Sequence, residues 1–114
     1  MHEMGLIDAI VRMVDKIVKD EGLAGVKKIT LEVGEISGVV PHFLTECYEA
    51  VVAGTPYEKT ELVIETVPGV FRCNDCEMDF PADVEHLCCP DCFGKNLTPV
   101  GGKDLTLKEI EAYE

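Results

Sequence analysis

The sequence contains no tryptophan and only seven phenylalanine and tyrosine residues, so its core must be built mostly from aliphatic side chains. It also has no apolar run that approaches the roughly eighteen residues of a membrane-spanning helix. The first residues lack the basic start and the long apolar segment of a secretion signal. These absences predict a cytoplasmic protein with reduced thiols and no membrane partner.

Positively charged residues are also scarce. The chain has 10 Lys and Arg residues and 22 Asp and Glu residues, which gives a formal net charge of −12. A nucleic-acid-binding protein needs Lys and Arg to displace the counterions of the phosphate backbone. The composition therefore argues against a nucleic-acid partner. The acidic excess is compatible with binding cations or a basic protein surface. A simpler explanation is that the charge keeps a small protein soluble.

Signs of catalysis are absent from the sequence as well. We find no nucleophile–base constellation and no glycine-rich phosphate loop. The prediction is therefore that the chain is not an enzyme. Its 114 residues fit one compact domain, or a core domain that carries a small appendage.

Hydrophobic periodicity predicts two helices and three strands. Apolar residues have helical spacing over residues 6–21, and Gly22 is expected to stop that helix. They have it again over residues 41–53, where Pro41 suits the first helical position. We expect Phe43 to lie on the inward face of the second helix. Alternating apolar residues predict strands over three ranges: 29–33, 61–67 and 103–112.

The positions of the cysteines divide the chain into two predicted domains. Residues 1–70 and 104–114 are expected to form a helix-and-strand domain, and residues 71–103 a smaller one inserted near its end. The inserted segment holds few aliphatic residues, so it cannot fold by burial alone and depends on a metal. Both crossings between the two parts contain glycine, which favours a tilt of one part against the other.

Four of the six cysteines have zinc-ribbon spacing: Cys73-x-x-Cys76, a gap of twelve residues, then Cys89-x-x-Cys92. In a reducing compartment this pattern indicates a metal site rather than disulfides. Each C-x-x-C turn directs two thiolates at one ion, and two such turns complete a closed tetrahedron. Because no ligand position is left open for a water, we predict a structural zinc site and not a catalytic one.

Other candidate ligands leave alternatives open. Cys88 is a spare in this interpretation, either a buried small side chain or an accessible thiol. His86 is close enough in sequence to compete for zinc, although we favour its exclusion. A redox C-x-x-C usually opens a helix in a βαβ setting, and neither pair has that context. Cys47 lies on the apolar face of the second helix and is predicted to be a core residue.

The N-terminus offers a second candidate metal site. A bulky second residue protects the initiator methionine from removal, so Met1 should keep a free α-amine beside the backbone nitrogen and the imidazole of His2. Ni(II) and Cu(II) favour such planar nitrogen donors, and zinc gains less from them. The first N–H groups of a helix lack intrahelical acceptors, and Glu3 and Asp8 offset the repulsion of a cation by the helix dipole. The alternative is a disordered terminus without a ligand role.

A set of motifs runs over essentially the whole chain: Met1-His2-Glu3-Met4, the amphipathic first helix, Leu31 to Val39 (LEVGEISGV), Glu61 to Glu65 (ELVIE), the two cysteine pairs and Lys108 to Glu111 (KEIE). In this order they resemble the HypA family, the nickel chaperones of nickel–iron hydrogenase maturation. Three positions depart from the usual pattern of that family: Glu77 replaces a common Gly, Phe93 intervenes between Cys92 and the next Gly, and Cys88 doubles the third ligand position.

The resemblance implies an α+β fold in which two helices pack on a small, mainly antiparallel sheet as a nickel-binding domain, with a four-cysteine zinc-ribbon domain inserted. It implies that His2 is the nickel ligand, that Met1 and Glu3 assist, and that Ni(II) is a transiently bound cargo. The implied partners are a HypB-type GTPase and the hydrogenase large subunit, with urease a further recipient in some members. We expect a monomer or a weak homodimer. The alternative is a zinc-ribbon adaptor or nucleic-acid-binding module without a nickel function.

Overall fold

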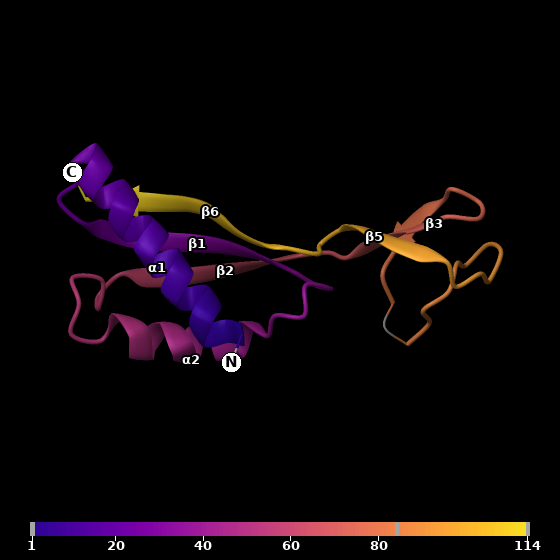
Figure 1. Cartoon of the computed structure of the whole chain (residues 1–114), viewed down its shortest axis with the longest axis horizontal. Helices are drawn as coiled ribbons and strands as arrows, with labels where there is room; N and C mark the ends of the chain where they lie inside the picture. Colours follow the sequence, from indigo (N-terminus) through magenta and orange to yellow (C-terminus); the bar gives the residue numbers. More distant parts are fainter. Residues whose placement is uncertain (1, 84, 114) are drawn as a thin grey trace.

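The computed structural model describes residues 2–83 and 85–113, without the side chain of His2. The elements follow along the chain as α1 (His2–Glu21), β1 (Val26–Gly34), α2 (Pro41–Val52), β2 (Glu61–Val67), β3 (Val70–Cys73), β4 (Asp79–Pro81), β5 (Leu97–Gly101) and β6 (Leu105–Ala112). They form an elongated molecule of 54 × 26 × 16 Å in which two three-stranded sheets lie end to end (Figure 1). The helix-bearing sheet has the strand order β2-β1-β6, and the cysteine-bearing sheet has the order β4-β3-β5.

Helix α1 begins at His2, so the predicted start at residue 6 was wrong by one turn. The first turn carries an acidic residue, Glu3, as the positive end of a helix dipole favours. Its apolar residue Met4 is 38% exposed, so this turn does not follow the buried stripe from which the helix was predicted. The end is as predicted, because Gly22 has a φ of 64° and stops the helix.

The helix-bearing sheet is mixed. Helix α2 carries the chain from β1 to β2, and this crossover makes the two strands parallel. β1 pairs with β6 antiparallel. Both pairings in the cysteine-bearing sheet are antiparallel, so the α+β class with two helices and a mainly antiparallel set of strands is confirmed. Phe43 of α2, expected to face inward, is instead 47% exposed.

The main core lies between the two helices and the central strand β1. Helix α1 crosses one face of the helix-bearing sheet (Figure 1) and packs against α2. Cys47 is buried in this core, as predicted. The hydroxyl of Tyr48 donates to the carbonyl of Thr60 at 2.9 Å, so the buried phenol has a partner. The central apolar side chains are Ile7, Ile10, Val14, Ile29, Leu31, Val33, Leu44 and Val52.

The cysteine-bearing sheet has a separate and much smaller core. Its buried members are Cys73, Phe80 and Cys89, with Phe71, Met78 and Leu97 partly buried around them. So little apolar surface does not hold three short strands together by burial alone. Strand β3 begins at Val70, one residue before the boundary expected from the sequence. The division into two domains stays a prediction.

Neither helix in the described part of the chain combines the length and the apolar character that a membrane crossing requires.

Candidate metal centres

The two C-x-x-C segments fold into matching turns, the first at the end of β3 and the second in the loop between β4 and β5. Cys73 closes β3, and its N–H donates to the Met78 carbonyl at 2.9 Å while its own carbonyl accepts from Glu77 N–H at 2.8 Å. The second turn has the same hydrogen bonds at the same sequence spacing: Cys89 N–H donates to Gly94 O at 2.8 Å, and Cys89 O accepts from Phe93 N–H at 2.8 Å. Each turn therefore places its two cysteine side chains on the same side.

The residue that follows the second cysteine of each turn, Glu77 or Phe93, has a left-handed backbone conformation. Glu77 and Phe93 have φ values of 58° and 59°, and they are the non-glycine residues with positive φ within the described ranges. Left-handed backbone favours glycine, because a Cβ is crowded there. The turns keep this geometry although the residues that occupy it are not glycine.

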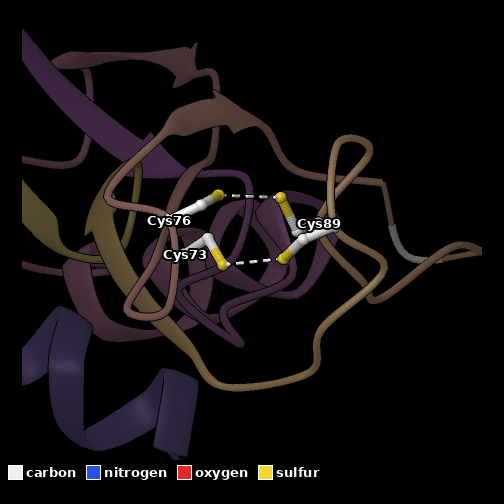
Figure 2. A group of neighbouring side chains, drawn as sticks. Cys73, Cys76 and Cys89 are labelled. Atoms are coloured by element: carbon white, nitrogen blue, oxygen red, sulfur yellow. Dashed lines mark hydrogen bonds between the residues drawn. The ribbon is translucent and has the colours of Figure 1, made fainter.

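The four sulfur atoms converge on one point between the turns. Cys73 Sγ lies 3.6 Å from Cys92 Sγ, and Cys76 Sγ lies 3.5 Å from Cys89 Sγ (Figure 2). All four lie within 4.8 Å of one another. A disulfide requires an S–S distance of about 2.05 Å. A tetrahedral zinc ion with Zn–S bonds of about 2.3 Å separates its sulfurs by about 3.8 Å. The donor set fits one tetrahedral, thiolate-bound ion with no open position.

Hydrogen bonds already favour a thiolate at the centre of this cluster. Cys73 and Cys89 are buried, and Cys76 and Cys92 are exposed. Backbone N–H groups of Cys92 and Asp91 lower the pKa of the Cys89 thiol to about 7. Four thiolates this close would repel one another. The hydrogen bond between the Cys76 and Cys89 side chains raises the pKa of the Cys76 thiol to about 12. A divalent cation is the charge that lets such thiols ionise together.

Cys88 does not join the four sulfurs. Its side chain is half-buried, and the group of metal-binding geometry contains Cys89 in its place. His86 lies instead in an exposed group with Asp83 and Glu85, where its Nδ1 is 3.0 Å from an oxygen of Asp83. His86 was a ligand candidate from the sequence and its two acidic neighbours were not, although the spacing D-x-E-H places all three in one turn.

The described part of the expected nickel site, the His2 backbone and Glu3, belongs to α1 of the helix-bearing part. Met1 and the side chain of His2 are outside the described residues, whereas the backbone of His2 opens α1. Glu3 lies in the first turn and is half-buried. The N–H groups of a first helical turn have no intrahelical acceptor. Figure 1 shows this end of α1 beside α2, well apart from the cysteine-bearing sheet.

Comparison with known proteins gives one consistent family. The family described as "Hydrogenase/urease nickel incorporation, metallochaperone, hypA" matches residues 1–112. A relative named "Hydrogenase maturation factor HypA", from Geobacter metallireducens, is 38% identical over 111 residues, which cover 97% of this chain and 98% of the relative.

Solved structures share the fold over nearly the full length. One, described as "Solution structure of HypA protein", has a TM-score of 0.74 at 19% identity and is matched over 99% of this chain and 97% of its own. Another, the Ni metallochaperone HypA from Helicobacter pylori, has a TM-score of 0.70 at 18% identity, with 96% of each chain covered. The whole-chain family match and these relatives show that the chain belongs to the HypA family of nickel-incorporation metallochaperones.

Proposed function

We propose that this chain is a metallochaperone that binds Ni(II) at its N-terminus and takes part in nickel insertion into nickel–iron hydrogenase. The observation that supports it most is the family match from residue 1 to residue 112, which includes the segment Met1-His2-Glu3. The family description also names urease, so urease is a second candidate recipient.

The proposed nickel site uses the Met1 amine, backbone nitrogen and the His2 imidazole. Ni(II) favours several nitrogen donors in one plane, and fused chelate rings supply them from consecutive residues. Metallating an N–H of the first turn breaks no helical hydrogen bond, because such a group has no acceptor in the helix. Glu3 supplies a nearby negative charge that offsets the helix dipole.

Release of the cargo follows from the same arrangement. Only one side chain, that of His2, anchors the ion in this proposal, so a partner can dismantle the site by displacing that ligand. Protonation of the amine and the imidazole competes with nickel, so affinity falls as the pH drops through the histidine range, about 6.5. The proposed partners are a HypB-type GTPase and the hydrogenase large subunit, and the proposed location is the cytoplasm.

The second proposed metal is resident zinc held by Cys73, Cys76, Cys89 and Cys92. It would close the two turns and supply no reaction chemistry, because four thiolates leave no position for water or substrate. A monomer or weak homodimer is enough for both roles, since each site is made from one chain.

The test is nickel binding by protein that carries a free Met1 amine and no N-terminal tag. We expect His2→Ala to lose stoichiometric Ni(II) binding in equilibrium dialysis and to keep its zinc and its circular dichroism spectrum. His42→Ala is the matched control, because this exposed histidine of α2 pairs only with Glu46, at 3.1 Å, among the described residues. Unchanged nickel affinity in His2→Ala would sink the proposal and favour a zinc-ribbon adaptor.

A further inference from the structure

Phe93 combines two features that are unfavourable for folding. Its φ of 59° lies in the left-handed region, which a bulky residue rarely adopts. The backbone is held there by the turn, in which Phe93 N–H donates to Cys89 O at 2.8 Å. The residue is nevertheless 73% exposed, so packing does not offset the strain. The turn requires this backbone conformation but not a phenylalanine in it, so the choice of an exposed aromatic side chain points to a use outside the fold.

The exposed ring forms one wall of a groove of about 500 Å³ on the cysteine-bearing sheet. Phe80, which is 7% exposed, belongs to the small core and also lines the groove. Pro81 and Pro90 add two rigid apolar surfaces. A concave, mostly apolar surface of this size accommodates side chains from a binding partner.

The polar boundary of the groove is acidic. Asp83 lines it, and the N–H of Glu85 and the His86 ring hold the pKa of the Asp83 carboxyl below its usual range. Glu85 and Asp91 are exposed neighbours of lining residues. Arg72, on β3 of the same sheet, is already paired with Asp79 at 2.8 Å. A binding partner of complementary charge therefore carries Lys or Arg beside its apolar group.

We propose that the groove beside Phe93 docks a protein segment that presents an apolar side chain flanked by basic residues. The apolar group fills the space between Phe93, Phe80 and the two prolines, while the basic residues face Asp83 and its acidic neighbours. This surface is separate from the proposed nickel residues, so it adds a recognition site and does not depend on nickel binding.

The test uses zinc-loaded full-length protein, ¹⁵N-labelled, and three synthetic peptides of equal length. The first alternates Arg with Leu and Phe, the second replaces each Arg with Glu, and the third keeps Arg and replaces Leu and Phe with Ser. We expect saturable chemical-shift changes from the first peptide, centred on amides of residues 80–93. The second and third peptides should bind about tenfold more weakly or worse.

Two glycine variants separate docking from folding. Phe93→Gly relieves the left-handed strain, so it should keep zinc and thermal stability while it lowers affinity for the first peptide about tenfold, the range of an aromatic contact residue. Glu77→Gly relieves the equivalent strain in the other turn and should leave peptide affinity unchanged. Equal affinity of Phe93→Gly and the parent, equal binding of the Ser or Glu peptide, or no shifts with the first peptide would each overturn the proposal. None of these results would alter nickel binding by His2.

Discussion

The carbonyl oxygen of Gly102 lies against Cα of Gly34 so closely that a Cβ on Gly34 would overlap it. Gly102 has a φ of 60° and is itself packed on the backbone of Pro68. The N–H of Ile36 donates to Gly102 O at 2.9 Å, and the N–H of Glu35 donates to Val67 O at 2.8 Å. Three chain segments thus meet at the junction between the two sheets. The glycines of the crossing near residues 101–104 were expected to allow tilting, and one of them, Gly102, also has a packing role here.

Alanine at Gly34 should destabilise the protein because the added Cβ meets backbone and not a side chain that can move away. We expect Gly34→Ala to lower the free energy of unfolding by about 1–3 kcal/mol, as overpacking usually does. Urea denaturation followed by circular dichroism measures this change.

The control for that prediction is Gly5→Ala on α1, where an added Cβ meets nothing within 4 Å. Alanine favours a helix over glycine by about 0.5–1 kcal/mol, so this variant should be as stable as the parent or more so. Equal stability of the two variants would show that the junction is free to adjust.

The choice of Cys89 over Cys88 as the third zinc ligand predicts opposite outcomes for two neighbouring substitutions. Cys88→Ser should keep about one zinc per chain, because its sulfur is outside the four-sulfur group. Cys89→Ser should lose tight zinc binding, since it removes the buried sulfur whose pKa is lowered to about 7. Metal analysis after dialysis decides between them, and zinc retained by Cys89→Ser would contradict the assignment.

Removal of zinc should unfold the cysteine-bearing sheet and leave the helix-bearing sheet intact. Among the described residues, the first has Phe80 and two cysteines as its buried core, whereas the second has a continuous core of aliphatic side chains. Hydrogen exchange after treatment with a strong chelator should show lost protection in β3 and β5 and retained protection in β1. Simultaneous loss in both sheets would mean that they fold as one unit.

Two tyrosines should make the protein sensitive to alkali. Burial raises the pKa of Tyr48 to about 12. Burial, followed by the 2.6 Å hydrogen bond to Asp15, raises that of Tyr57 to about 12. A folded pKa above the unfolded value of about 10 gives stability that is present below pH 10 and lost as the pH rises toward 12.

Absorbance at the tyrosinate band, recorded with unfolding curves across that interval, tests this expectation. Tyr48→Phe should remove one high-pH ionisation and reduce the loss of stability between pH 10 and 12. Tyr48→Phe with the same alkaline loss as the parent would show that the phenol does not control it.

Much of the secondary structure was predictable because it depends on neighbours in sequence. Helix α2 and strand β2 were expected nearly at their observed bounds, and Gly22 ends α1 where predicted. The surface turn at the start of α1 was missed because periodicity detects only buried stripes. Whether β1 pairs parallel or antiparallel with each neighbour could not be derived from any strand alone, because it depends on the path of the connecting chain.

The sequence by itself determined the two C-x-x-C turns, the amphipathic helices and the identity of the metal-binding residue types, since all of these arise from residues a few positions apart. Spacing already favoured Cys89 over Cys88, and the tertiary structure brings its sulfur to the other three. Tertiary structure alone decided that Gly34 must make room for Gly102 and that Phe93 lines an acidic-rimmed groove. These relationships join segments far apart in the chain. They depend on packing and strand register, which no local pattern encodes.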